Sequence, residues 1–489
     1  MKLGALAARA ALPLADTFAA AADANVTGFA IDHRKVAPGT VFGAFVGAVV
    51  NGEDFIPAAV AAGAIAVVAR AEAQVAGALH IIADNPRRAF ARLAAGFFTP
   101  VPATIVAVTG TNGKTSCVEM TRQLWRMAGH RAASIGTLGV TTPDESVSTG
   151  LTTPDIVTFL ANLGGLAREG VTHVAYEASS HGLAQFRNEG PKVVAGAFTN
   201  LSRDHLDYHA TMEDYFAAKM RLFDEIVADE GAAAVWADDA WSARACEHVR
   251  GRGLRLLTVG EEGETIRLLA SSPGLLGQTL EVEYEGTRHK IALPLIGAYQ
   301  AANALVSAAL VIAVGGDAGE TFAALARLQP VRGRLERAAL TQAGAPVYVD
   351  YAHTPDALEA AIAALRPHTA GRLIVVFGAG GDRDQGKRPA MARKACALAD
   401  VEIVTDDNPR GEDPAAIRAM VLAGATDARE IADRRAAIAA AVGEARSGDI
   451  VLIAGKGHEQ GQIVGAGEDM RILPFDDVEV ACECAGAIT

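Results

Sequence analysis

The sequence predicts an α/β protein with mainly parallel sheets. Apolar runs recur along the chain without alternation between apolar and polar residues, which is typical of strands buried on both faces. Alanine-rich stretches of helical length separate these runs, and strands that alternate with helices predict parallel sheets. Functional loops are therefore expected at the carboxyl ends of the strands. The expected strands are 64–69, 104–110, 173–179, 193–200, 372–380, 401–407 and 449–457.

The length and composition predict several folded domains. The chain has 489 residues, of which 50% are hydrophobic and 21% are charged, so that sizeable cores can form. At about 150 residues per domain, the prior is about three domains. Proline-containing breaks near residues 100 and 330 mark the expected boundaries, and residues 276–295 are expected to form an antiparallel meander. The expected domains are 1–101, 102–331 and 332–489.

The bulk properties also exclude some classes of protein. The net charge of -13 argues against a general nucleic-acid binder, which would present a basic field. The five cysteines include no pair with zinc-ligand spacing, so they are expected to be reduced thiols in a cytoplasmic protein. Arg9 interrupts the first apolar run, which favours an amphipathic first helix over a signal peptide. No run of 18 apolar residues exists, so no membrane insertion is expected.

The strand at 104–110 leads into the glycine-rich segment GTNGKTS and then into a helix. Its glycines let backbone N–H groups close around phosphate oxygens, while Lys114 can reach the β- and γ-phosphates and Thr115 can bind Mg²⁺. Val108 stands where the full P-loop pattern has glycine. A plain turn with a surface lysine is the alternative, but the flanking strand and helix favour a nucleoside triphosphate site. Its expected residues are Gly110, Thr111, Asn112, Gly113, Lys114, Thr115 and Ser116.

Two further polar residues are expected beside this loop. Glu177 and His205 each follow an apolar strand, so each should lie at the carboxyl edge of the same sheet. They could complete a Mg²⁺ shell with Thr115. Taken alone, the glutamate is more often an ion-pair partner and the histidine more often structural.

A series of motifs in this chain resembles one family. GTNGKTS, EASSHGLAQFR, FTNLSRDHLDYH, VDYAHTPD, VFGAGGDRDQGKRP, DNPR and GKGHE, in this order, are similar to those of the Mur ligases, and within that family to the MurE type. The resemblance implies an N-terminal UDP-binding domain, a central P-loop ATPase-like domain with a parallel sheet, and a C-terminal Rossmann-like domain that binds an amino acid. It also implies that the protein is a cytoplasmic, monomeric enzyme of peptidoglycan precursor synthesis.

The resemblance also implies an activity. ATP would phosphorylate a carboxylate of UDP-N-acetylmuramoyl-L-alanyl-D-glutamate, and the amine of meso-diaminopimelate would attack the acyl phosphate to form an amide. ATP is then a co-substrate, Mg²⁺ is the cofactor, and all partners are small molecules. Phosphorylation is physically necessary because a carboxylate and an ammonium do not condense unaided at neutral pH, while Lys114 and the metal offset charge on the transferring phosphoryl group.

Site residues follow from the matching motifs. Lys114, Lys219 and His205 match catalytic residues, and Lys219 matches a lysine that is carbamylated in the family. Without the resemblance, Lys219 would be read as a solvent-exposed lysine on a helix. Thr115, Glu177 and His205 match the metal ligands. Nucleotide contacts add Asn303, Arg334 and Asp350. The residues that match contacts of the UDP-sugar dipeptide are Ile31, His33, Thr152, Thr153, Ser179, Gln185 and Arg187, with His33 standing where a serine is usual.

The tetrapeptide Asp-Asn-Pro-Arg occurs twice, at 84–87 and at 407–410. The second copy matches the position that recognises diaminopimelate, whose distal carboxylate suits the fork of Arg410. The first copy is expected to start a helix, with Asp84 or Asn85 as the N-cap, Pro86 in the first turn, and Arg87 and Arg88 in solvent. The expected diaminopimelate residues are Arg383, Asp407, Asn408, Pro409, Arg410, Gly455 and Glu459.

Three alternatives stay open. A lysine-adding ligase of the same type is disfavoured because L-lysine would leave the Arg410 guanidinium unpaired. Amide ligases of the MurF, MurD, folylpolyglutamate or cyanophycin types should lack the combined Arg383, Asn408, Arg410 and Glu459 set. A protein that only senses nucleotide is disfavoured by Lys114, Glu177, His205 and Lys219.

Overall fold

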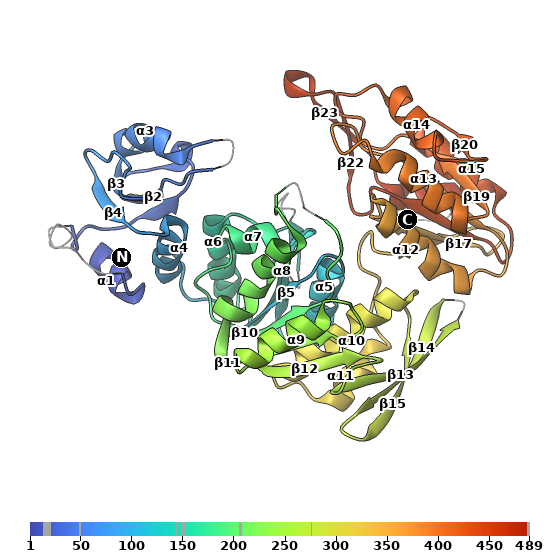
Figure 1. The fold of residues 1–489 in the computed structure, drawn as a ribbon, viewed down its shortest axis with the longest axis horizontal. Helices are drawn as coiled ribbons and strands as arrows, with labels where there is room; N and C mark the ends of the chain where they lie inside the picture. The colour runs from blue at the N-terminus through green and yellow to red at the C-terminus, as the bar shows by residue number, and fades with distance from the viewer. Residues whose placement is uncertain are drawn as a thin grey trace. The chain divides into compact units, whose positions relative to one another are not determined.

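The computed structural model describes residues 1–12, 21–47, 50–142, 144–147, 152–204, 208–274 and 276–486 (Figure 1). The chain divides into two compact units: unit 1 comprises 1–265 and 306–321, and unit 2 comprises 266–305 and 322–489. The α/β class is confirmed, while the three expected domain bounds remain a prediction. In the part of the chain that is described, none of the helices combines the length and the apolar character of a membrane span.

Unit 1 begins with a small sheet. Its four strands are all parallel and lie in chain order, and the expected strand at 64–69 is confirmed. The expected first helix is also confirmed, with Leu3 and Leu6 buried and Arg9 exposed. The elements are α1 (Leu3–Arg9), β1 (Gly28–Ala30), η1 (His33–Lys35), β2 (Thr40–Gly43), η2 (Gly52–Phe55), α3 (Ile56–Ala61), β3 (Ala64–Ala69), β4 (Leu79–Ile82) and α4 (Pro86–Phe97).

The second sheet of unit 1 carries the glycine-rich loop. Within this unit its strand order is β12-β11-β10-β5-β9-β6-β7-β8, and β5 lies between β10 and β9 in parallel register. The carboxyl ends of these three strands therefore meet at one edge. The strands are β5 (Thr104–Thr109), β6 (Ala132–Gly136), β7 (Gly139–Thr141), β8 (Ser146–Val147), β9 (His173–Glu177), β10 (Val193–Phe198), β11 (Val227–Trp236) and β12 (Arg255–Gly260). The helices are α5 (Lys114–Met127), α6 (Ile156–Arg168), α7 (Ser180–Ala184), α8 (Met212–Arg221), η3 (Leu222–Ile226) and α9 (Ser242–Gly251).

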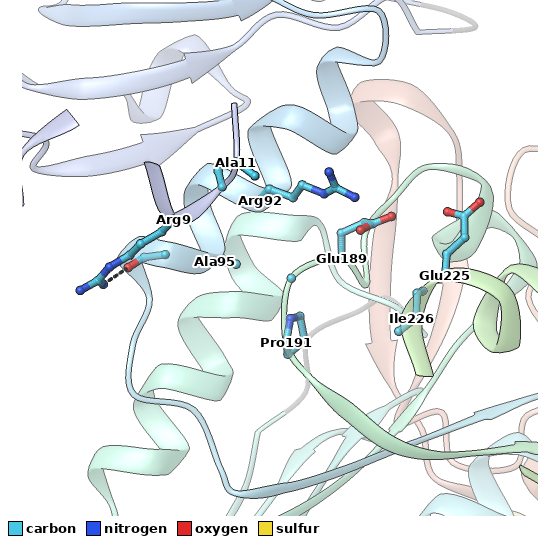
Figure 2. A pocket seen from close by; sticks show the side chains of 11 residues that line it. Arg9, Ala11, Arg92, Ala95, Glu189, Pro191, Glu225 and Ile226 are labelled. Atoms are coloured by element: carbon cyan, nitrogen blue, oxygen red, sulfur yellow. Dashed lines mark hydrogen bonds between the residues drawn. The ribbon is translucent and has the colours of Figure 1, made fainter. Parts of the chain in front are cut away.

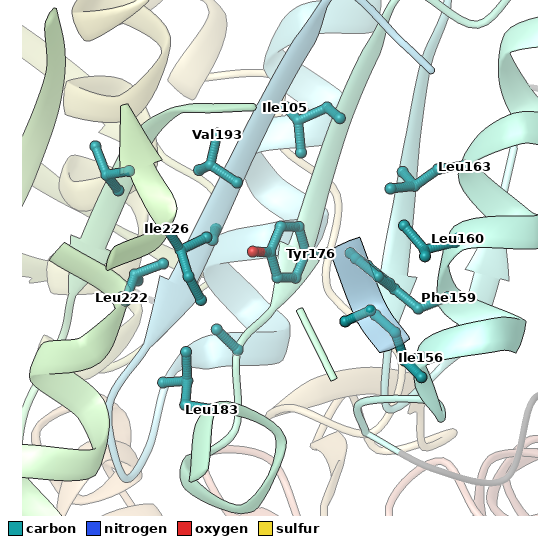
Figure 3. Packing of buried hydrophobic residues seen from close by; sticks show 14 of the residues in the cluster. Ile105, Ile156, Phe159, Leu160, Leu163, Tyr176, Leu183, Val193, Leu222 and Ile226 are labelled. Atoms are coloured by element: carbon teal, nitrogen blue, oxygen red, sulfur yellow. The ribbon is translucent and has the colours of Figure 1, made fainter. Parts of the chain in front are cut away.

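Aromatic and branched side chains fill the core of unit 1. Figure 3 shows Phe159 and Leu163 of α6 facing Tyr176 of β9, and the Phe159 and Tyr176 rings lie 5.0 Å apart in an edge-on arrangement. Each fully buried side chain of this size contributes about 1.5–3 kcal/mol relative to leaving it exposed. This packing fixes α6 against the sheet and so holds the loops at its edge.

Unit 2 contains an antiparallel meander and a six-stranded sheet. The expected meander is confirmed, and the larger sheet has the order β16-β17-β21-β18-β19-β20, with every pair after β16-β17 parallel. The meander strands are β13 (Ile266–Gly274), β14 (Gly277–Tyr284) and β15 (Thr287–Leu293). The strands of the six-stranded sheet are β16 (Glu336–Leu340), β17 (Pro346–Asp350), β18 (Leu373–Phe377), β19 (Val401–Val404), β20 (Arg429–Glu430) and β21 (Ile450–Ala454). A separate antiparallel pair is formed by β22 (Gly461–Val464) and β23 (Arg471–Pro474).

Helices flank the parallel strands of unit 2, as expected when crossover connections join such strands. Leu358 of α12 and Met391 of α13 are buried in one core cluster with Leu373 and Phe377 of β18. The helices that follow the meander are α10 (Ala298–Ala313), α11 (Ala318–Leu325), α12 (Pro355–Leu365), η4 (Arg366–His368), α13 (Lys387–Leu398), α14 (Pro414–Leu422), α15 (Arg434–Glu444), η5 (Gly467–Asp469) and α16 (Asp477–Ala485).

Candidate active site

The glycine-rich loop joins β5 to α5, as the sequence predicts. Gly110 has a φ of 148° and Gly113 has a φ of 86°, and both values favour glycine. A Cβ at Gly110 would also lie 1.9 Å from Thr199 Oγ1, which the site cannot accommodate. Gly113 precedes the first residue of α5, so backbone N–H groups and the helix dipole point toward this loop. This geometry suits the binding of phosphate.

Two lysines converge on the loop. Lys114 Nζ donates to the carbonyls of Gly110 at 3.0 Å and Thr111 at 2.7 Å, and Lys219 Nζ donates to the same Gly110 carbonyl at 2.7 Å. Lys219 is only 1% exposed, which rules out the solvated alternative, and it lies 4.3 Å from the ring of Tyr215. Burial, and then the charge of Lys114, lower the pKa of Lys219 well below its ordinary value.

The segment after β10 holds the loop in place. Thr199 Oγ1 donates to the Asn112 carbonyl at 2.6 Å, and Asn200 Oδ1 accepts from the Asn112 N–H at 2.9 Å. The Thr111 and Tyr215 hydroxyls lie 3.2 Å apart. Sequence reasoning missed these supporting residues, although Thr199 and Asn200 lie in the FTNLSRDHLDYH motif.

Glu177 ends β9 and is 2% exposed. Its carboxylate accepts from the Thr137 N–H at 2.7 Å and from the Thr137 hydroxyl at 3.2 Å, and a Cβ at Gly136 would lie 2.2 Å from its Oε1. Thr115, whose hydroxyl is the other predicted oxygen ligand, is buried in the first turn of α5. Oxygen ligands of this kind suit Mg²⁺. His205 lies outside the described residues.

The predicted contacts of the UDP-sugar dipeptide form one connected group on the central sheet. The Thr137 and Thr152 hydroxyls lie 3.1 Å apart, and Thr153 Oγ1 donates to the Glu177 carbonyl at 2.9 Å. The Thr153 and Ser179 hydroxyls lie 2.9 Å apart. The structure therefore brings these hydroxyls together beside the Glu177 backbone.

Arg187 extends this group. Its Nη1 donates to the Thr153 carbonyl at 3.1 Å, and its Nε and Nη2 donate to Gln185 Oε1 at 3.1 and 2.6 Å. Burial lowers the pKa of Arg187, which is the expected effect on a cation that is drawn out of water. His33 and Ile31 are placed on and beside η1 instead, where the His33 ring stacks on Phe55 at 4.5 Å. Among the residues that the structure describes, no hydrogen bond or ion pair joins Ile31 or His33 to the Thr153 group.

Two of the predicted nucleotide residues of unit 2, Asp350 and Arg334, lie at the end of β17. Asp350 is 8% exposed, and its two carboxylate oxygens accept from the Leu335 N–H at 2.7 Å and the Ala352 N–H at 2.9 Å. Burial raises the pKa of Asp350. The Arg334 guanidinium lies 4.7 Å from the ring of Tyr351, and Asn303 is buried on α10.

The predicted diaminopimelate residues lie on loops after β21, β18 and β19, which are neighbouring parallel strands of unit 2. Asn408 Nδ2 donates to Glu459 Oε2 at 2.8 Å, which joins two of these loops. Gly455 has a φ of 121°, and a Cβ there would lie 2.5 Å from Asp407 Oδ2. Arg383 is exposed in the loop after β18.

Arg410 is partly buried and has a φ of 52°, a value that is uncommon for a residue with a side chain. Its N–H donates to the Ile463 carbonyl at 3.0 Å, and its carbonyl accepts from the Gly465 N–H at 2.7 Å, so β22 holds this conformation. Its Nη1 donates to the carbonyls of Gly381 at 3.0 Å and Asn408 at 3.4 Å. The guanidinium is therefore oriented by backbone groups.

The first Asp-Asn-Pro-Arg copy begins α4, as predicted, and Asn85 is the N-cap, since its Oδ1 accepts from the Arg88 N–H at 3.0 Å. The prediction that its arginines are solvated is wrong. Arg88 pairs with Glu189 at 3.3 Å and with Glu225 at 3.0 Å, and its side chain is 30% exposed. Arg87 donates to the Val46 carbonyl at 3.2 Å. The local pattern specifies the helix start but not these distant partners.

A cavity of about 490 Å³ lies beside this helix (Figure 2). Arg92 of α4 and Glu189 contribute to its walls, together with Arg9 and Glu225. Of the predicted functional residues that the structure describes, none lines it. The cavity therefore belongs to the packing around α4 and is separate from the candidate active site.

Family models match three parts of the chain. The model described as "Mur ligase family, catalytic domain" matches residues 25–97, the "Mur ligase middle domain" matches 108–311, and the "Mur ligase, glutamate ligase domain" matches 333–457. Together they include the glycine-rich loop, the carboxyl edges of both larger sheets and the second Asp-Asn-Pro-Arg copy.

Similar proteins span almost the whole chain. The UDP-N-acetylmuramoyl-L-alanyl-D-glutamate--2,6-diaminopimelate ligase of Zymomonas mobilis subsp. mobilis is 62% identical over 461 residues, which are 94% of this chain and 95% of that protein. The ligase of the same name from Bradyrhizobium diazoefficiens is 53% identical over 464 residues, with 94% and 95% covered.

Solved structures are similar over a comparable length. A structure with that ligase name is 33% identical, covers 94% of this chain and 95% of its own, and has a TM-score of 0.71. The MurF ligase of Thermotoga maritima in complex with ADP is 18% identical, covers 94% of this chain and 96% of its own, and shares the fold with a TM-score of 0.60.

Proposed function

Because this chain belongs to the Mur ligase family, we propose that it uses ATP to join 2,6-diaminopimelate to UDP-N-acetylmuramoyl-L-alanyl-D-glutamate. The observation that carries the proposal is the partly buried Arg410, which β22 and the carbonyls of Gly381 and Asn408 hold in place, while the Asn408 amide donates to Glu459. A cationic fork beside a carboxylate suits an amino acid whose side chain ends in its own carboxylate and ammonium. Relatives named for this ligation support the same acceptor.

The glycine-rich loop would bind the triphosphate of ATP through Gly110, Thr111, Asn112, Gly113, Lys114, Thr115 and Ser116. Lys114 would hold the β- and γ-phosphate oxygens, and the first turn of α5 would add its N–H groups. Thr115 and Glu177, with His205, would hold Mg²⁺, and the buried Glu177 carboxylate fits that task. When bound, Mg²⁺ would offset negative charge on the transferring phosphoryl group.

Lys219 would act as a carbamate. An amine must be neutral to react with CO₂, and burial together with the Lys114 charge lowers the pKa of Lys219 and favours the neutral form. The neutral amine would add to CO₂ and release one proton, which gives a carbamate anion in place of the ammonium that Lys114 would repel. It would then pair with Lys114 and help to organise the metal site.

Thr152, Thr153, Ser179, Gln185 and Arg187 would bind the dipeptide end of the nucleotide-sugar substrate. Their hydroxyls and the guanidinium suit carboxylate and phosphate oxygens, and they lie beside Glu177. Ile31 and His33 would contact the UDP end. Asn303, Arg334 and Asp350 would contact the adenosine part of ATP.

The acceptor site would use the loops after β18, β19 and β21. Arg410 and Arg383 would bind the distal carboxylate, and Glu459 would accept from the distal ammonium. Asn408, Asp407, Pro409 and Gly455 would shape the pocket. The resemblance to the MurE type makes meso-diaminopimelate the proposed acceptor. The enzyme would act as a cytoplasmic monomer in peptidoglycan precursor synthesis.

The proposal is tested by supplying purified protein with ATP, Mg²⁺ and UDP-N-acetylmuramoyl-L-alanyl-D-glutamate. Meso-diaminopimelate, its LL isomer, L-lysine and L-ornithine are offered in parallel, and product mass and ADP release are measured. The expected result is an adduct with meso-diaminopimelate at a kcat/KM at least one hundredfold above that for L-lysine. An L-lysine adduct formed equally well would overturn the acceptor assignment, and ADP release without any amino acid adduct would overturn the ligase assignment.

A further inference from the structure

The ammonium of Lys456 lies at the centre of the proposed acceptor site. Lys456 follows Gly455 in the loop after β21 and is 0% exposed. Its Nζ donates to Asn408 Oδ1 at 2.9 Å, to the Gly461 carbonyl at 2.5 Å and to Glu459 Oε2 at 3.4 Å. An ammonium has three donors, so these three acceptors use all of them. Lys456 thus joins the loop after β19, its own loop and the start of β22.

These bonds leave the Asn408 amide a single orientation. Its Oδ1 accepts both from Lys456 and from the Ile463 N–H at 2.9 Å. An amide turned by 180° would place its NH₂ group against two donors, so the oxygen must face Lys456. The Nδ2 group is then directed at Glu459 Oε2, which it reaches at 2.8 Å. The lysine therefore acts on Glu459 both directly and through Asn408.

The consequence for Glu459 is a fixed carboxylate. Both donors that reach it from the described residues end on Oε2, and its side chain is 31% exposed. Oε1 therefore keeps its acceptor capacity for a ligand.

We propose that Lys456 is a positioning residue for acceptor specificity, because it holds Asn408 and Glu459 in the arrangement that receives the ammonium of the incoming amino acid. The inference rests on the proposed function, since it assumes an amino acid acceptor at this site. Lys456 itself has its donors filled by protein atoms and does not touch the substrate. Its loss should therefore weaken acceptor binding and leave the binding of ATP and of the nucleotide-sugar substrate unchanged.

The test is the variant Lys456→Met, which keeps an unbranched side chain and removes the charge and the three donors. Steady-state kinetics vary ATP, UDP-N-acetylmuramoyl-L-alanyl-D-glutamate and meso-diaminopimelate in turn. We expect the KM for diaminopimelate to rise at least tenfold and the other two KM values to change less than twofold. Lys394→Met is the matched control, because Lys394 pairs with Glu359 at 2.7 Å on the surface, and it should change none of the three.

A second pair of variants separates positioning from folding. Glu459→Gln removes the carboxylate that Lys456 orients, and the double variant removes both charges together, so that neither remains buried without a partner. If Lys456 acts through Glu459, adding Lys456→Met to Glu459→Gln should change the KM for diaminopimelate less than threefold. A further rise of tenfold or more in that background would overturn the inference, and this comparison holds even if Lys456→Met alone fails to fold.

The outcomes distinguish this inference from the proposed function. If the unaltered protein ligates diaminopimelate and Lys456→Met leaves its KM within twofold, the positioning role is wrong and the proposed function stands. If all three KM values rise together in Lys456→Met, the role is structural only, which also overturns the inference. If the unaltered protein forms no diaminopimelate adduct, the proposed function fails, whatever the variants do.

Discussion

The variant Arg410→Ala tests the acceptor assignment most directly. In the structure, Arg410 Nη1 is engaged by the carbonyls of Gly381 and Asn408, so a ligand carboxylate would approach the edge formed by Nε and Nη2. Two charge-assisted hydrogen bonds would form there, each worth about 1.5–3 kcal/mol when buried. Arg410 is only partly buried, so we take about 3 kcal/mol for the pair.

A loss of about 3 kcal/mol corresponds to a fall of about 150-fold in kcat/KM for meso-diaminopimelate, since each 1.4 kcal/mol is a factor of ten. L-lysine lacks the distal carboxylate and should lose nothing. Its kcat/KM should stay constant or rise, because the variant no longer leaves a guanidinium desolvated and unpaired. The preference for diaminopimelate over L-lysine should therefore collapse by the same factor of about 150.

The assay is ADP release with each acceptor, confirmed by product mass. Arg410→Lys keeps the charge and loses the forked geometry. Its kcat/KM for meso-diaminopimelate should therefore lie between those of the unaltered protein and Arg410→Ala, at about a tenfold loss. The KM for ATP should not change in either variant. A fall of less than threefold for diaminopimelate, or an equal fall for L-lysine, would refute the pairing of Arg410 with the distal carboxylate.

The remaining predictions concern Lys219, Arg88 and Gly381. Lys219→Ala should lower kcat at least one hundredfold, and removal of dissolved CO₂ should lower the activity of the unaltered protein reversibly. Folding lowers the pKa of unmodified Lys219, so between that lowered pKa and 10.5 the unfolded chain binds one proton more than the folded chain. The free energy of unfolding should therefore rise with pH in this window, as measured by urea unfolding in CO₂-free buffer. Lys219→Met should flatten the rise. Arg88→Ala should lower the melting temperature by about 3–6 °C, measured by calorimetry. About 1–2 kcal/mol is lost because, among the described residues, Glu189 then keeps one ion pair, to Arg221 at 3.4 Å, with the charge of Arg92 nearby. Arg87 is more lightly bonded, so Arg87→Ala should lower the melting temperature less. Gly381→Ala should raise the KM for diaminopimelate more than tenfold without changing that for ATP, because its Cβ would lie 1.9 Å from the Pro409 carbonyl oxygen and would displace the loop that carries Arg410.

The sequence predicted the strands well because buried parallel strands carry a local signal. All seven apolar runs form strands, and β3 has the expected bounds of 64–69. The start of α4 was also predictable, since an asparagine followed by proline specifies an N-cap without any distant partner. Loops at the carboxyl ends of the strands follow from the parallel topology itself.

Contacts between distant segments could not be predicted in this way. Thr137 holds the Glu177 carboxylate although 40 residues separate them, and Lys456 holds Asn408 across 48 residues. Threonine and lysine are common on surfaces, so neither residue stands out in the sequence. Their role arises only when the sheet order places β6 beside β9, and places β21 and β19 on either side of β18. That order is a property of the whole fold.

The two Asp-Asn-Pro-Arg copies show how the same four residues acquire different tasks. At 84–87 the asparagine oxygen accepts from the Arg88 backbone N–H, and the proline begins α4. The arginine side chains that follow bind protein groups. At 407–410 the asparagine oxygen accepts from the buried Lys456 instead, no helix starts at the proline, and the arginine takes a left-handed conformation against β22. In the first copy the asparagine side chain is satisfied from within its own segment, by the start of α4. The second copy depends on a lysine from another loop, so a change at Lys456 should alter the function of the second copy and leave the first copy intact.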